Sequence, residues 1–238
     1  MSVYWLQQTG SDLPPDNGWL SERELACLRP LRFPKRRADW RLGRWTAKRA
    51  LAALLHLSSS DLSGVSILAA PSGAPEVFSA GRPMDLALSI SHSGGAALCA
   101  IAQPDAAIGC DLELIEPHSD AFAADYFTAE EQARVAQASD RALHLTLLWS
   151  AKESALKALH AGLRLDTRDL QVDFRAKTIP CASPAGDWSP FQVRSLAGGL
   201  FYGWWQVSGT QLRTLATATP SPAPVSLSCF PVCSAGRG

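Results

Sequence analysis

The first half of the chain combines one long helical pattern with short strand patterns. Apolar side chains recur at helical spacing over residues 38–57, which predicts an amphipathic helix. Short apolar runs at 65–69, 87–90 and 96–102 are flanked by glycine, proline or serine and predict strands. The first half is therefore expected to contain both kinds of element.

The second half begins with a strict alternation of apolar and polar positions. Residues 108–114, IGCDLEL, place apolar side chains at every second position, which is typical of a half-buried strand. Thr128 and Glu131 form a capping-box pattern that predicts a helix start, and a longer helix is predicted over 141–160. Further strands are expected at 171–174, 191–196, 200–207 and 212–218, the last two as a hairpin around SGTQ. Because helices and strands mix without strict β–α–β alternation, the predicted fold class is α+β.

These elements divide the chain into two halves and a tail. We predict an N-terminal half over 1–107 and a C-terminal half over 108–218, whose mixed elements are compatible with one shared architecture. From residue 219 onward the chain is rich in proline, serine and alanine without periodicity. Such a composition buries too little apolar surface to become ordered, so we expect a disordered tail over 219–238.

Composition and charge exclude several classes of function. The 238 residues are 47% hydrophobic and 18% charged, with a formal net charge of zero, so no whole-molecule field attracts nucleic acid or an anionic membrane. The N-terminus lacks the basic start and apolar stretch of a signal peptide, and no apolar run is long enough to span a bilayer. We therefore expect a cytoplasmic protein that binds neither nucleic acid nor membrane.

The cysteines predict neither a disulfide scaffold nor a metal site. Six cysteines are too few for a disulfide framework in a chain of this size. In CFPVC, three residues separate Cys229 from Cys233, whereas common zinc and redox motifs have two. We expect reduced cysteines.

Residues 35–51, KRRADWRLGRWTAKRAL, form the most basic part of the chain. At about 100° per residue, one stripe of the predicted helix carries Arg37, Arg41, Arg44 and Lys48. Such a stripe is compatible with a solvated basic face. It is also compatible with a site for phosphate groups, which arginine side chains bind in a bidentate manner.

Two carboxylates project from the same side of the strand predicted at 108–114. Asp111 and Glu113 are two residues apart, so their Cα atoms are separated by roughly 6.6 Å at about 3.3 Å per residue. Magnesium commonly takes one or two protein carboxylates together with water and substrate phosphate. An exposed polar strand face explains the same alternation, and both interpretations stay open at this point.

The stretch LLWSAKESALKAL, residues 147–159, places charged side chains inside an otherwise apolar helix. Glu153 and Lys157 are four residues apart and share a face, whereas Lys152 points about 100° away. Alone, the pair would be a surface ion pair worth about a few tenths of a kcal/mol. Beside Asp111 and Glu113, however, Glu153 would supply a third carboxylate to a magnesium site, and Lys157 would contact bound phosphates.

A fourth candidate is SISHSGG, residues 89–95, at the end of a predicted strand. Ser91 and His92 with the following glycines offer hydroxyl, imidazole and open backbone to a phosphate. A serine-hydrolase site is disfavoured, since G-x-S-x-G is absent and adjacent strand residues point to opposite faces.

Taken together, the motifs closely resemble those of the 4'-phosphopantetheinyl transferases. IGCDLE is followed about forty residues later by WSAKESALK, and the basic helix, PSGAP and SISHS precede both in the order of that family. The resemblance spans roughly residues 33 to 170 and is to the surfactin type, which is one chain of two similar halves. It implies a pseudo-twofold pair of α+β subdomains with coenzyme A bound between the halves.

The resemblance also implies a reaction and assigns roles to matching residues. The phosphopantetheine arm of coenzyme A would be transferred to a serine of an apo acyl or peptidyl carrier protein, releasing adenosine 3',5'-bisphosphate. Asp111, Glu113 and Glu153 would hold Mg2+ against the pyrophosphate. Glu153 would also act as general base, directly or through a water, and Lys157 would neutralise or protonate the leaving phosphate.

The other implied contacts are to coenzyme A. They would come from Arg37, Arg44, Gly73, Pro75, Ser91 and His92, in addition to Lys157. The chain departs from the family at Ala74, where many relatives carry lysine, and at Cys110, where a larger aliphatic residue is usual. Because one chain holds both halves, we expect a monomer.

Two rival classes of function are weighed against the transferase. A non-catalytic module that binds coenzyme A or a nucleotide would keep the basic helix without requiring the three carboxylates to converge. A hydrolase would use Ser91 and His92 and would not need magnesium.

Overall fold

The computed structural model describes residues 1–160, 165–174 and 187–229. Its contacts divide the chain into two compact units. Unit 1 comprises Met1–Ala106 and Pro224–Gly238, and unit 2 comprises Ala107–Ala223. Each unit combines helices with antiparallel sheet, so the α+β prediction is confirmed. Within the described residues, no helix is both long and apolar enough to cross a membrane.

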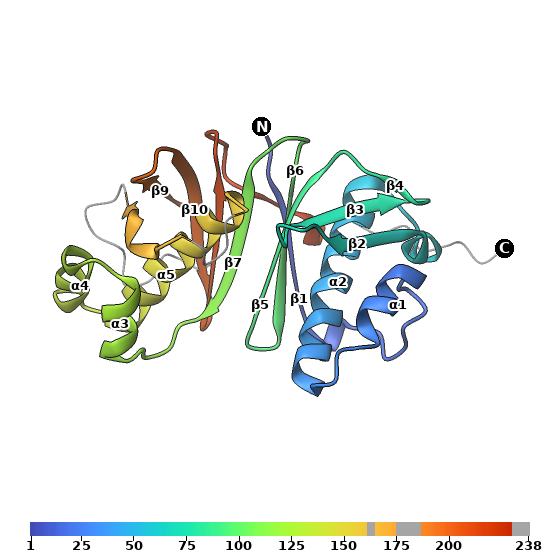
Figure 1. Ribbon diagram of the computed structural model, residues 1–238, viewed down its shortest axis with the longest axis horizontal. Helices are drawn as coiled ribbons and strands as arrows, with labels where there is room; N and C mark the ends of the chain where they lie inside the picture. Colours follow the sequence, from blue (N-terminus) through green and yellow to red (C-terminus); the bar gives the residue numbers. More distant parts are fainter. Residues whose placement is uncertain (161–164, 175–186, 230–238) are drawn as a thin grey trace. The chain divides into compact units, whose positions relative to one another are not determined.

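Unit 1 is built around one long helix. Its elements are β1 (Tyr4–Thr9), α1 (Glu22–Leu28), α2 (Pro34–Leu55), β2 (Val65–Ala69), β3 (Pro75–Ser79), β4 (Arg82–Pro83), β5 (Ala87–Ser93), β6 (Ala96–Ala102) and β12 (Val225–Ser226). The strands form a sheet of order β12-β1-β6-β5 and a smaller sheet of order β2-β3-β4. Helix α2 packs along the sheet of β1, β5 and β6 (Figure 1).

The sequence explains both ends of α2. Pro34 stands at the start of the helix, where a missing N–H costs no hydrogen bond, so α2 begins four residues before the predicted start. His56 ends the helix in the left-handed conformation, with φ of 57°. Between the two ends, Ala47, Ala50 and Leu51 are completely buried against the sheet.

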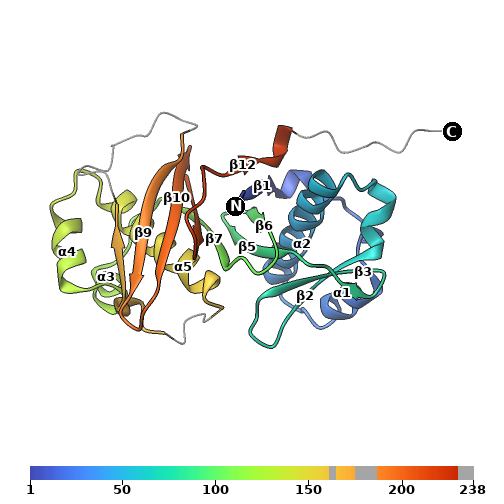
Figure 2. The same cartoon turned by 90° about the horizontal axis from the view of Figure 1, so that it is seen from above.

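Unit 2 is a five-stranded antiparallel sheet with its helices on one side. Its elements are β7 (Ile108–Leu114), α3 (Asp120–Tyr126), α4 (Ala129–Ala136), α5 (Arg141–Ala158), β8 (Leu170–Asp173), β9 (Ser189–Ser195), β10 (Leu200–Ser208) and β11 (Gln211–Thr217). The strand order is β7-β11-β10-β9-β8. Helix α5 lies across this sheet, and α3 and α4 lie beside one another next to α5 (Figure 2).

Side-chain hydrogen bonds cap the N-termini of the helices of unit 2. Thr128 accepts a hydrogen bond from the Glu131 amide, and Glu131 bonds back to Thr128, which confirms the predicted capping box at α4. Asp140 accepts from the Leu143 amide and caps α5. The hairpin predicted around SGTQ is formed by β10 and β11.

The structure differs from the predicted tail in the residues that it describes. Val225 and Ser226 pair in parallel with β1, and Leu227 is only 2% exposed in the core beside α2. A compositional average over twenty residues misses this single leucine, whose burial anchors the segment. Residues 230–238, which include Cys233 of the CFPVC motif, lie outside the described residues.

We expect Leu227→Ala to destabilise unit 1 by about 2–5 kcal/mol, because it removes a buried side chain from a closed core. The matched control is Val225→Ala, since Val225 is 42% exposed. Urea unfolding of the two variants and the wild type measures the difference. Equal losses in both variants would show that Leu227 does not anchor the segment.

Candidate functional site

The carboxylates of β7 lie on the side of the strand that faces α5. A Cβ added to Gly109 would lie 2.6 Å from the amide nitrogen of Ala158 and would overlap the carbonyl oxygen of Ser154, so α5 packs directly against this side of β7. Asp111 and Glu113 share the side of Gly109 by strand alternation. The prediction of a half-buried strand is therefore wrong at Asp111, which is only 3% exposed because α5 covers the polar side.

Asp111 and Lys157 form an ion pair at the junction of β7 and α5. Lys157 Nζ donates to Asp111 Oδ1 at 2.8 Å, and the side chain of Lys157 is 29% exposed. Burial by itself would lower the pKa of Lys157, but Asp111, Cys110 and Glu153 together raise the pKa above its ordinary value. Lys157 is therefore held in its cationic form, with part of its surface open to a ligand.

Glu153 lies one helical turn before Lys157 and belongs to the same electrostatic cluster. Burial raises the pKa of Glu153; Lys157 opposes this rise, whereas the negative charge of Asp111 adds to it. The net effect is a carboxylate that binds a proton more readily than an exposed glutamate. Such a shift suits a group that must accept a proton during catalysis.

Glu113 is oriented by a different residue of α5. Trp149 Nε1 donates to Glu113 Oε1 at 3.0 Å. The indole is itself held by edge contacts with Phe122 and Tyr126 of α3, whose ring centroids lie 5.2 and 4.9 Å away. An aromatic cluster therefore fixes the donor that sets the orientation of this carboxylate.

The three carboxylates fit magnesium in donor chemistry. Asp111, Glu113 and Glu153 supply hard oxygen ligands from two packed elements, and the charge of Asp111 disfavours ionisation of Glu153, a repulsion that a divalent cation would relieve. Among the described residues, no three His, Cys, Asp or Glu side chains are gathered closely enough to define a metal site. Lys157 is the cation next to Asp111 in this conformation.

The shift of Glu153 predicts a pH-dependent stability. Because its folded pKa lies above its unfolded pKa, its stabilising contribution is complete below the unfolded value and is lost as pH rises through the folded value. Glu153→Gln is thus expected to be more stable than wild type at about pH 8 in a chelating buffer, with the difference shrinking toward about pH 4. Urea unfolding across this range measures it; a difference of opposite slope would contradict the assigned cause.

The basic stripe of α2 bonds to the chain's own carbonyl groups. The hydrogen bonds run from Arg37 to Leu28, from Arg41 to Pro14, Pro15 and Asp16, from Arg44 to Ile67, and from Lys48 to Trp19 and Leu62. Lys48 is completely buried and pairs with Glu24, so it does not extend a positive edge. The sequence left two interpretations of this stripe open, a solvated face and a phosphate site. Neither includes these hydrogen bonds, because the carbonyl groups that accept them belong to segments outside α2.

The other positions predicted in unit 1 lie at turns and strand ends. Gly73, with φ of 90°, forms the exposed turn between β2 and β3, and Pro75 begins β3. On β5, Ser91 is buried whereas its neighbour His92 is exposed. The opposite environments of Ser91 and His92 agree with strand alternation and disfavour a catalytic pair.

The sequence analysis did not identify the ion pair of Lys152 with Glu131. The side chain of Lys152 is completely buried and its Nζ lies 2.7 Å from Glu131 Oε2. A repeat in the sequence could have indicated this ion pair. The pattern W-[ST]-A-K occurs at residues 45–48 and 149–152, and each copy has a [ST]-x-x-E capping-box pattern upstream.

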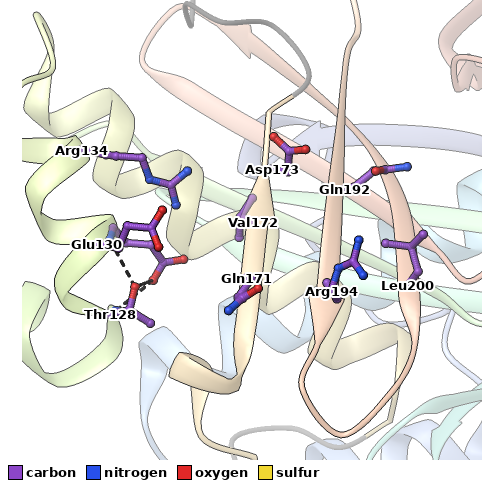
Figure 3. Close-up of a pocket in the computed structure, with 10 residues that line it drawn as sticks. Thr128, Glu130, Arg134, Gln171, Val172, Asp173, Gln192, Arg194 and Leu200 are labelled. Atoms are coloured by element: carbon purple, nitrogen blue, oxygen red, sulfur yellow. Dashed lines mark hydrogen bonds between the residues drawn. The ribbon is translucent and has the colours of Figure 1, made fainter.

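A pocket of about 370 Å3 lies between α4 and the strands β8 to β10. Figure 3 shows Arg134 extending from α4 toward β8, while Gln192 and Arg194 lie on β9. Glu131 also lines this pocket, whereas none of the residues predicted for the active site does.

Both halves of the chain match family models of one class of enzyme. Residues 32–102 match the 4'-phosphopantetheinyl transferase N-terminal domain, and residues 107–208 match the 4'-phosphopantetheinyl transferase superfamily. The comparison with curated proteins found no match. The two matches follow one another along the chain, and together they support a 4'-phosphopantetheinyl transferase family. Members of this family act on carrier proteins and use coenzyme A.

Proposed function

We propose that the protein transfers the 4'-phosphopantetheine group of coenzyme A to a serine of an apo acyl or peptidyl carrier protein. The observation that carries this proposal is the Lys157–Asp111 ion pair where α5 packs on β7, with Glu153 one helical turn away and electrostatically coupled to both groups. We also propose the surfactin type, supported by the two domain matches in one chain, and a monomer.

The proposed reaction exchanges the phosphoanhydride bond of coenzyme A for a new phosphoester bond to serine. The serine hydroxyl oxygen bonds to the phosphorus that carries pantetheine, and the bond from this phosphorus to the bridging pyrophosphate oxygen breaks. Adenosine 3',5'-bisphosphate leaves with that bonding pair. Glu153 accepts the serine proton, directly or through a water. The Lys157 ammonium neutralises the leaving phosphate.

Magnesium is the proposed metal, held by Asp111, Glu113 and Glu153. When bound, it would draw off negative charge that develops on the transferred phosphoryl group. Trp149 keeps Glu113 directed toward α5 through the indole hydrogen bond. Asp111, paired with Lys157, keeps the ammonium beside the carboxylates.

We assign further coenzyme A contacts to unit 1. Arg37 and Arg44 each use a hydrogen bond on a backbone carbonyl, and a guanidinium has five N–H donors, so both can also bind the 3'-phosphate. The residues proposed to contact the remaining parts of coenzyme A are Gly73, Pro75, Ser91 and His92. A cytoplasmic location stays a prediction from the sequence.

Intact-mass spectrometry tests the proposed function. Apo acyl carrier and apo peptidyl carrier proteins are each incubated with the protein, coenzyme A and magnesium, beside a chelated control. The expected result is a gain of one phosphopantetheine mass that disappears with the chelator. No gain on either carrier, despite measured coenzyme A binding, would favour the binding-module alternative.

A further inference from the structure

Within WSAKES a second lysine, Lys152, stands directly before Glu153, and in the structure its ion-pair partner is a buried glutamate. Lys152 is 0% exposed, and its ammonium bonds to Glu131 Oε2 at 2.7 Å. The ammonium also lies 5.0 Å from the ring centroid of Phe127. Burial lowers the pKa of Lys152, while Glu131 opposes the shift. A buried ion pair of this kind contributes little to stability, because desolvation offsets the attraction between the charges.

Glu131 connects Lys152 to the start of another helix. The same Oε2 atom that meets Lys152 accepts the Thr128 amide at 3.0 Å, closing the capping box of α4. The ion pair therefore couples the N-terminus of α4 to one face of α5. Any rotation of α5 about its axis must break the pair or displace the cap.

The opposite side of α5 is attached to the sheet. The hydroxyl groups of Ser150 and Thr214 form a hydrogen bond at 2.9 Å, and the Thr214 hydroxyl also donates to the Ser150 carbonyl at 2.8 Å. Gly109 allows the close approach of β7 to α5. Helix α5 is thus held between the sheet and α4, with Glu153 and Lys157 on the face between these attachments.

Unit 1 repeats the same arrangement without the reactive groups. Lys48 of α2 pairs with Glu24, and Glu24 closes the capping box of α1 with Ser21. When the two W-[ST]-A-K segments are aligned, the positions of Glu153 and Lys157 are occupied by Arg49 and Ala53. The ion pair is therefore present in both units, but only in unit 2 does it adjoin the carboxylate cluster.

We propose that Lys152 and Glu131 are positioning residues, which set the rotation of α5 and thereby align Glu153 and Lys157 with β7. This inference rests on the proposed function for its catalytic consequence. Its structural content, the placement of α5 on β7, is independent of that function. Neither residue contacts the transferred group.

The experiment compares two double variants. The first combines Glu131→Gln with Lys152→Met and removes both charges of the ion pair, so no buried charge is left unpaired. The glutamine side chain can still close the capping box with Thr128. Glu24→Gln with Lys48→Met is the matched control in unit 1. The control is the costlier change for folding, because Lys48 also donates to two carbonyls, of Trp19 and Leu62 at 2.9 and 2.8 Å, whereas Lys152 donates to one, of Tyr126 at 3.4 Å.

Two readouts are measured on both variants and on wild type. The first is phosphopantetheine transfer, separated into kcat and the KM for coenzyme A. The second is the NMR signal of the Trp149 indole N–H, assigned with Trp149→Phe. This proton bonds to Glu113 across the α5–β7 junction and reports its alignment without any turnover.

We expect the unit 2 variant to lose about tenfold or more in kcat with little change in KM, and to shift the indole signal. The control should keep kcat and the indole signal of wild type. An unshifted indole signal in the unit 2 variant, or equal effects in the two variants, would overturn the inference. If wild type transfers nothing but the indole signal shifts only in the unit 2 variant, the positioning role stands and the proposed function fails.

Discussion

Glu153→Gln is expected to lower phosphopantetheine transfer by about 10²–10⁴-fold, the usual contribution of a general base. The substitution keeps the size of the side chain and its place on α5, but the amide cannot accept the serine proton. Initial rates of carrier modification, followed by intact mass at saturating coenzyme A, measure the effect.

Glu116→Gln is the control, since Glu116 is an exposed glutamate that follows β7. A Glu153→Gln rate within a few-fold of wild type would remove Glu153 from the mechanism. The same variant is expected to gain stability at alkaline pH, because burial disfavours the ionised carboxylate of Glu153. Lower activity with higher stability would distinguish a functional residue from one that supports the fold.

Gly109→Ala is expected to reduce both stability and transfer. The added methyl group would overlap the Ser154 carbonyl and lie 2.6 Å from the Ala158 amide nitrogen, so α5 must move away from β7. We expect a loss on the order of 1–3 kcal/mol in the free energy of unfolding, typical of overpacking. Transfer should fall by about 10²-fold, because a displacement near 1 Å misaligns the reacting groups.

Gly64→Ala provides the control for the glycine substitution. A Cβ at Gly64 meets no atom within 4 Å, so this change adds the same methyl group without a clash. Urea unfolding and carrier modification are measured for both variants. Wild-type activity in Gly109→Ala would mean that the spacing of α5 and β7 does not matter to transfer.

Local sequence patterns predict most elements of the fold. The capping box at Thr128 and Glu131 depends on residues three positions apart, and the structure confirms it. The hairpin of β10 and β11 likewise follows from two apolar runs around a short polar turn. Such features are determined by neighbours along the chain, so they are accessible without knowledge of the tertiary structure.

Contacts between distant segments explain where the predictions were incomplete. Helical periodicity places Lys48 on a basic stripe, but the chain before α2 folds over it and supplies Glu24 as its partner. The alternation in β7 indicates a solvent-facing side for Asp111, yet α5 covers that side. In both cases the periodicity identifies the face correctly but cannot say what packs against it.

Strand and helix periodicity predict that Asp111 and Glu113 share one side of a strand and that Glu153 and Lys157 share one face of a helix. Repeat distances along a strand and a helix are sufficient for that. That these two surfaces meet, with Lys157 on Asp111 and Trp149 on Glu113, depends on how α5 packs on β7. The inward direction of Lys152, toward Glu131, likewise depends on the packing of α4 beside α5. The reason is physical: packing brings together groups that are more than twenty residues apart, and burial then selects the charge pairs that can persist without water.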